Sequence, residues 1–269
     1  MVGVRGLTLF GQHFSHYCDQ YVLIGGVASS LVMGEAGVSF RTTKDLDIVL
    51  IIEALDSQFV AAFWAFVHSG GYQVRQASSA HPVFYRFQNP TDETYPAQLE
   101  LFSRTPDELD HPEHATLTPI PTDESVSSLS AILLDEGYYA FLLEGRRQND
   151  TLSYIGGDRL IPFKAKAWLD LSARKSAGEH VDSRNIRKHR NDIVMLTGLL
   201  TSEVVSLPTG IANDMARFLR CLAEEDLNLK AMGVRGSRES IIERLALTFG
   251  IYLPAQHRQC DSYASPKNV

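Results

Sequence analysis

The sequence predicts an α/β (α+β) protein with an N-terminal mixed sheet flanked by helices and a C-terminal helical domain. Short apolar runs typical of strands alternate with amphipathic helical segments as far as residue 157, and helical patterns alone follow. The chain has 269 residues and 44% hydrophobic content, enough for two cores. We therefore expect one domain over residues 1–157 and a second over residues 158–269.

The first domain begins with a helix over residues 5–19, whose apolar side chains recur every three or four positions. An apolar strand, a Gly pair, a small-residue helix and an acidic strand follow. Asp56 is expected to cap the next helix, which ends at Gly70-Gly71. Strands are expected at 21–24, 45–52, 72–76, 83–88 and 97–102.

The amino-acid composition changes in the middle of the chain. Residues 105–125 are rich in Pro, Thr, Asp and His, which favours a long loop, and we interpret His111 and His114 as solvated within it. Strands are expected at 128–134, 138–143 and 151–155, with a polar turn at 146–150. The second domain is expected to have a helix opened by Pro162, a helix capped by Asp182, and a polar tail, with helices over 162–175, 184–200, 209–226 and 236–250.

Composition narrows the functional classes. No run of about eighteen apolar residues is present and the first residues lack a secretory pattern, so we expect a cytoplasmic protein with no membrane span. Cys18, Cys221 and Cys260 are widely spaced, as expected of reduced thiols. The net charge of −7 argues against broad nonspecific binding to nucleic acid. The basic stretch Arg184–Arg190 fits either a phosphate backbone or a solvated helix face.

The segment from residue 21 to residue 52 carries the strongest chemical signal. Gly25 and Gly26 have no Cβ, so a phosphate can approach their backbone, and the following helix offers free N–H groups at its start. Asp45 and Asp47 are two positions apart on a strand and therefore share a face. Two adjacent carboxylates repel one another unless a cation lies between them, and Mg²⁺ favours such a pair together with substrate phosphates. Each piece alone also fits ordinary structure, a Gly-Gly turn or a solvated strand edge.

The motif GG-x-A followed by RTTKDLDIVL resembles the opening motif of the nucleotidyltransferase superfamily. Within it, the pattern is similar to the AbiEii-type branch, which includes toxins of toxin–antitoxin and abortive-infection systems. The resemblance implies that Gly25 and Gly26 bind the nucleotide, that Asp45 and Asp47 bind Mg²⁺ or Mn²⁺, and that the Arg-x-Thr lead-in, Arg41 and Thr43, belongs to the same site.

The resemblance also implies the reaction. The expected activity is transfer of a nucleotide from a nucleoside triphosphate to a hydroxyl of RNA, for example a tRNA 3′ end, or of a protein, with a cognate antitoxin as a further partner. The substrate is expected in a cleft between the domains. A non-catalytic nucleotide-binding module, or a protein-interaction module with the same fold, is the alternative.

Four further residues extend this site. Glu100 is a lone acid in an apolar strand. It is a third metal ligand or a base if that strand lies beside the acidic strand, and otherwise an outward-facing side chain. In the second domain, the resemblance implies that Lys164 contacts the nucleotide phosphates. It also matches Lys188 and Asp192 to a Lys-x-x-Asp pattern, although the spacing here is four rather than three. The structural alternative is a solvated Lys164 beside an ion pair of Lys166 with Asp170.

Overall fold

The computed structural model describes residues 4–77, 84–102, 118–120, 132–133 and 135–253. The chain divides into two compact units, and each is described here by itself. The sheet unit comprises residues 1–123 and 142–156, and the helical unit comprises residues 124–141 and 157–269. One change from the sheet unit to the helical unit falls between residues 156 and 157, next to the expected domain boundary. Residues 124–141 belong to the helical unit and not to the sheet unit.

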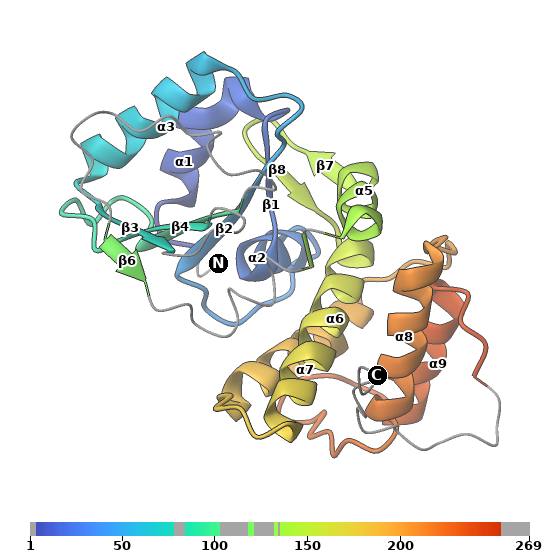
Figure 1. The fold of residues 1–269 in the computed structure, drawn as a ribbon. Coiled ribbons are helices and arrows are strands. Elements are labelled where there is room, and N and C mark those ends of the chain that lie inside the picture. Colours follow the sequence, from blue (N-terminus) through green and yellow to red (C-terminus); the bar gives the residue numbers. More distant parts are fainter. Residues whose placement is uncertain (1–3, 78–83, 103–117, 121–131, 134, 254–269) are drawn as a thin grey trace, which may run out of the picture. The chain divides into compact units, whose positions relative to one another are not determined.

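The sheet unit is built on a mixed sheet of eight strands in the order β6-β3-β4-β5-β2-β1-β8-β7 (Figure 1). Three neighbouring pairs are parallel, namely β2 with β5, β1 with β8 and β3 with β6, and the others are antiparallel. The expectation of an α/β fold with a mixed sheet is confirmed. The strands are β1 (Tyr21–Leu23), β2 (Asp45–Leu50), β3 (Gln73–Ala77), β4 (Phe84–Gln88), β5 (Gln98–Phe102), β6 (Thr118–Ile120), β7 (Arg146–Gln148) and β8 (Ser153–Ile155).

Helices α1 (Leu7–Phe14) and α3 (Ser57–Gly70) pack on one face of this sheet through an aromatic core, and the 3₁₀ turn η1 (Ser15–Tyr17) follows α1. Phe63 and Trp64 of α3 contact Phe87 of β4 edge to face. Two local signals set the ends of α3, because the Asp56 side chain accepts a hydrogen bond from the Phe59 amide at 2.8 Å and Gly71 has a φ of 63°. Helix α2 (Gly25–Glu35) also belongs to this unit.

Two segments differ from the expected secondary structure. Residues 138–143 were expected as a strand but belong to helix α5 (Glu136–Glu144), in which Tyr138, Tyr139, Phe141 and Leu142 are buried and Ala140 is exposed. A short apolar run fits a buried helix as well as a strand, and this burial pattern is helical. The expected turn at 146–150 contains strand β7, whose polar residues are exposed at the sheet edge. The expected loop at 105–125, with His111 and His114, lies mostly outside the described residues, as does most of the segment 128–134.

The helical unit consists of α5, α6 (Gly157–Ser176), α7 (Ser183–Thr197), α8 (Thr209–Leu222) and α9 (Arg238–Thr248), in the part of it that the structure describes. Helix α6 packs against α7 and α8, and α9 packs against α7 and α8. Helix α6 begins at Gly157 and not at Pro162, which lies inside the helix and removes one backbone hydrogen bond. Lys166, for which an ion pair with Asp170 was the structural alternative, forms an ion pair with Asp214 of α8 at 2.9 Å.

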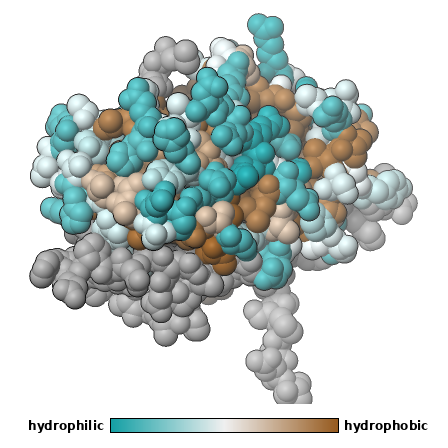
Figure 2. Space-filling view, turned by 90° about the horizontal axis from the view of Figure 1, so that it is seen from above, coloured by the Kyte–Doolittle hydropathy of each residue, from teal (hydrophilic) through white to brown (hydrophobic). Residues whose placement is uncertain are grey.

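Figure 2 shows hydrophilic residues over much of the visible face, with smaller hydrophobic areas among them. No helix in the described ranges is long and apolar enough to cross a membrane.

Cys18 is a buried free thiol, but Cys221 is disulfide-bonded, which differs from the expectation of reduced thiols throughout. Disulfide formation depends on approach in space, which spacing along the chain does not reveal.

Candidate functional site

The start of helix α2 is joined to the acidic strand β2 through Asp47. Helix α2 has no side-chain cap of its own, and the Gly26 amide donates a hydrogen bond to Asp47 Oδ2 at 3.2 Å. Gly25 has a φ of 62°, and a Cβ built there would lie 1.9 Å from Asp47 Oδ2. Glycine is therefore required at position 25 both by the left-handed backbone and by the close carboxylate. The Asp47 carboxylate occupies the positive end of α2, where a phosphate was expected to approach.

The polar segment before β2 lies against the same Gly pair. A Cβ built on Gly26 would lie 2.6 Å from Thr43 Oγ1 and 3.5 Å from Arg41 Nη2. These contacts bring Arg41 and Thr43 to the N-terminal end of α2, beside Asp47. Five of the residues singled out from the sequence, which are up to 22 positions apart (47 − 25), thus meet at one end of one helix.

The two further carboxylates lie on the same face of the sheet. Strands β2 and β5 are parallel neighbours, in which Asp47 is the register partner of Glu100 and Asp45 is the partner of Gln98. Side chains alternate along each strand, so Asp45, Asp47 and Glu100 share a face. The condition on which a third carboxylate depended, that the two strands be neighbours, is therefore met.

Glu100 is a buried acid with a strongly perturbed pKa. Its side chain is 10% exposed, and its Oε1 accepts hydrogen bonds from Arg86 Nε at 2.9 Å and from Gln98 Nε2 at 2.6 Å. Burial raises the pKa of Glu100 to about 8, the charges of Asp47 and Asp45 add to the increase, and the guanidinium of Arg86 opposes it.

The donor set fits a hard divalent cation in part. Among the described residues, no group of three or more His, Cys, Asp or Glu side chains is arranged to hold a metal ion. Asp47 is hydrogen-bonded to the Gly26 amide, and Glu100 is hydrogen-bonded to Arg86 and Gln98. Mg²⁺ needs only one or two carboxylates when phosphate oxygens and waters complete its shell, so Asp45 and Asp47 suffice as protein ligands.

The remaining candidate residues belong to the helical unit. Lys164 on α6 is 5% exposed, and its Nζ lies 2.9 Å from Asp192 Oδ2 on α7. Lys164 is therefore buried rather than solvated, and its charge is balanced by Asp192. Lys188 lies one helical turn before Asp192 and is exposed. The basic stretch Arg184–Arg190 is partly paired, since Arg184 contacts Asp182 and Arg190 contacts Glu225.

Sequence reasoning did not find Arg86 and Gln98, which hold Glu100. Arg86 lies between Tyr85 and Phe87 in the middle of a strand. A charged residue flanked by aromatic ones in a strand indicates that one face is polar and buried, and this signal was available. What it contacts depends on the pairing of β4 with β5, which places Arg86 opposite Glu100.

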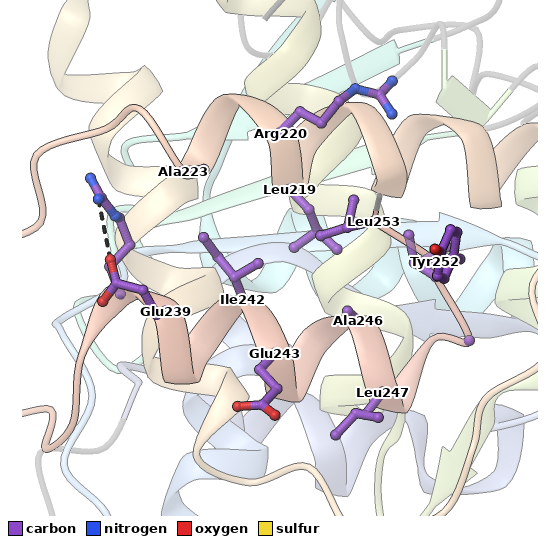
Figure 3. A pocket seen from close by; sticks show the side chains of 13 residues that line it. Leu219, Arg220, Ala223, Glu239, Ile242, Glu243, Ala246, Leu247, Tyr252 and Leu253 are labelled. Atoms are coloured by element: carbon purple, nitrogen blue, oxygen red, sulfur yellow. Dashed lines mark hydrogen bonds and ion pairs between the residues drawn. The ribbon is translucent and has the colours of Figure 1, made fainter. Parts of the chain in front are cut away.

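A separate cavity of about 570 Å³ lies in the helical unit between α8 and α9. Figure 3 shows Leu219 of α8 and Ile242 of α9 directed into the space between these helices, whereas Glu243 points away from it. None of the candidate carboxylates lines this cavity. Its walls are mainly apolar, which is unlike the polar sheet face.

No protein family model matches the chain. No curated protein matches it either. Two solved structures are similar to it in part. One is a nucleotidyltransferase-like antigenic protein from Paracoccidioides brasiliensis, with 15% identity and a TM-score of 0.41 over 85% of this chain and 91% of that chain. The other is the Cid1 poly(U) polymerase, with 8% identity and a TM-score of 0.23 over 86% of this chain and 90% of that chain. Similarity at this level assigns neither a family nor an activity to the chain.

Proposed function

We propose that the sheet unit binds a nucleoside triphosphate with Mg²⁺ or Mn²⁺ and transfers its nucleotidyl group to a hydroxyl acceptor. The observation that carries this proposal is the position of Asp47. Its carboxylate lies at the Gly25-Gly26 start of α2 and at the same level of the sheet as Glu100, and Asp45 shares its face. Carboxylates for a metal thus adjoin the glycine backbone at the start of α2.

The proposed chemistry is an in-line displacement. The acceptor oxygen attacks the α-phosphorus, the bond from this phosphorus to the bridging oxygen of the β-phosphate breaks, and pyrophosphate leaves. A bound Mg²⁺ supplies neutralising charge to the phosphates. Asp45 and Asp47 hold that cation, Arg41 and Thr43 orient the phosphates at the Gly pair, and Glu100 is the candidate to receive the proton of the hydroxyl. Catalysis then depends on positioning and electrostatics.

The contribution of the helical unit stays a prediction. Lys164 is expected to offset charge on the leaving pyrophosphate, and Lys188 and Asp192 are expected to support it. Lys164 Nζ is held by Asp192 at 2.9 Å, so contact with a phosphate requires this buried ion pair to open or to be shared with the ligand. The Arg187 and Lys188 side chains are exposed on α7, as a contact with an RNA backbone requires.

The acceptor and the biological role rest on the resemblance of the opening motif. We propose RNA, with a tRNA 3′ end as one candidate, or a protein side chain as acceptor. We also propose that the protein is the toxin of a toxin–antitoxin or abortive-infection system, held by a cognate antitoxin.

The deciding experiment incubates the protein with each labelled nucleoside triphosphate, Mg²⁺ and total RNA. The variants are Asp45→Asn and Asp47→Asn, which keep side-chain shape, and Asp150→Asn is the control because Asp150 is an exposed carboxylate of the same unit. Label is expected in RNA with the wild type and the control and not with the site variants or with EDTA. Label in protein moves the acceptor and keeps the chemistry. No transfer with any triphosphate contradicts the proposal.

A second candidate is a nucleotide-binding module without turnover. It is favoured by the absence, among the described residues, of a group of three or more His, Cys, Asp or Glu side chains arranged to hold a metal ion. Calorimetry with a non-hydrolysable triphosphate separates the two functions. Tight binding together with no transfer to RNA or protein supports the binding module.

A further inference from the structure

The polar face of the sheet is organised in two rows that cross strands β4, β5 and β2. In one row, Arg86 is the register partner of Glu100, and Glu100 is the partner of Asp47. In the next row, Gln88 is the partner of Gln98, and Gln98 is the partner of Asp45. The first row therefore places the guanidinium of Arg86 and the carboxyl groups of Glu100 and Asp47 on three successive strands.

The contacts within these rows hold one oxygen of Glu100. Arg86 Nε donates a hydrogen bond to Glu100 Oε1 at 2.9 Å, and Arg86 Nη2 lies 2.8 Å from the same oxygen. Gln98 Nε2 donates a further hydrogen bond to this oxygen at 2.6 Å. These are the polar contacts that the described residues make to the Glu100 side chain, and each of them is made to Oε1. A carboxylate fixed through one oxygen has a defined orientation for the other. Both Arg86 and Glu100 are about nine-tenths buried, so water competes little for the pair.

We propose that Arg86 is the positioning residue of the site, holding Glu100 through Oε1 so that its second oxygen serves as the third carboxylate beside Asp47. The inference rests on the proposed function, since it concerns the same metal and nucleotide site. Arg86 acts through Glu100 and not on the substrate. Gln98 assists from the neighbouring row.

This role has a consequence that a charge effect alone does not have. If Arg86 were only a nearby positive charge, its removal would relieve repulsion and strengthen binding of a divalent cation. If Arg86 positions Glu100, its removal lets the carboxyl group leave that position, so cation binding weakens. The two roles therefore predict opposite signs for the same substitution.

The experiment measures Mn²⁺ binding by electron paramagnetic resonance on the full chain, with wild type, Arg86→Met, Glu100→Gln and the double variant. Arg86→Met is expected to weaken Mn²⁺ binding by about 10-fold to 100-fold, the usual effect of losing a residue that orients a metal ligand. The double variant is expected to bind Mn²⁺ no more weakly than Glu100→Gln does, because loss of Arg86 should have no further effect once the Glu100 carboxylate has been replaced. Nucleotidyl transfer should follow the same pattern in kcat.

Two controls keep the result clear. Arg159→Met removes an arginine of similar burial that is paired with Asp158 in the helical unit, and it should leave Mn²⁺ binding unchanged. Arg86→Lys retains the charge and, if Arg86→Met unfolds, serves in its place, with a smaller loss expected. Unchanged or tighter Mn²⁺ binding by a folded Arg86 variant, or losses that multiply in the double variant, overturns the role of Arg86 and leaves the proposed function standing. Absence of Mn²⁺ binding and of transfer in the wild type overturns both.

Discussion

Replacement of Gly25 by alanine tests the geometry at the start of α2 most directly. Alanine adds a Cβ to a residue whose φ is 62°, and this Cβ would lie 1.9 Å from Asp47 Oδ2. The carboxylate must move away, and the hydrogen bond that it accepts from the Gly26 amide is lost. Two separate penalties therefore act in the same variant, one in the backbone and one in the carboxylate contact.

The size of the effect follows from these two penalties. A non-glycine residue in the left-handed region costs about 1–2 kcal/mol. A hydrogen bond to a charged acceptor contributes about 1.5–3 kcal/mol. Gly25→Ala should therefore lower the free energy of unfolding of the sheet unit by about 2.5–5 kcal/mol, a large part of the stability of an ordinary domain.

The assay uses the fact that the chain has two tryptophans. Trp64 lies on α3 in the sheet unit and Trp168 on α6 in the helical unit. In a Trp168→Phe background, fluorescence of Trp64 follows unfolding of the sheet unit alone, and urea titration gives its free energy of unfolding.

The matched control is Gly34→Ala in the same helix. A Cβ built on Gly34 meets nothing within 4 Å, and its φ is not positive. This variant should stabilise the unit by about 0.4–1 kcal/mol, because alanine is the better helix former. In an Asp47→Ala background, Gly25→Ala should cost only the backbone term of about 1–2 kcal/mol. A cost in that background equal to the cost in the wild type would refute the proposed clash with Asp47.

The remaining predictions concern buried polar contacts. Lys164→Met removes the 2.9 Å ion pair to the buried carboxylate of Asp192, so urea titration should show a loss of about 3–5 kcal/mol in the helical unit. The double variant Lys164→Met/Asp192→Leu should largely recover this loss, and an equal loss in both variants would contradict the prediction. Tyr138→Phe removes a 3.1 Å hydrogen bond to Asp214 and should lower the unfolding free energy by about 1.5–3 kcal/mol, against no change if the contact is absent in solution. The pKa of Glu100 is raised from 4.5 to about 8 in the folded state, so the folded state binds more protons. In metal-free buffer the unfolding free energy of the sheet unit should therefore fall as pH rises through this interval, and Glu100→Gln should remove that slope.

The elements predicted from sequence are those with local signals. Helix α3 was recognisable because its cap at Asp56 and its end at Gly71 depend on neighbouring residues. The common face of Asp45 and Asp47 follows from strand alternation alone. In contrast, the apolar run over 138–143 gave no information on whether its partners would be strands or helices, and tertiary packing made it part of α5.

The arrangement around Glu100 could not be predicted from local signals, because it depends on the pairing of three strands. A slip of one residue in β4 would turn Arg86 to the opposite face of the sheet. That face carries Phe87, which is fully buried against Phe63 and Trp64 of α3, so a slip would place a guanidinium in the aromatic core. The aromatic packing on one face thus sets the register that brings Arg86 to Glu100 on the other.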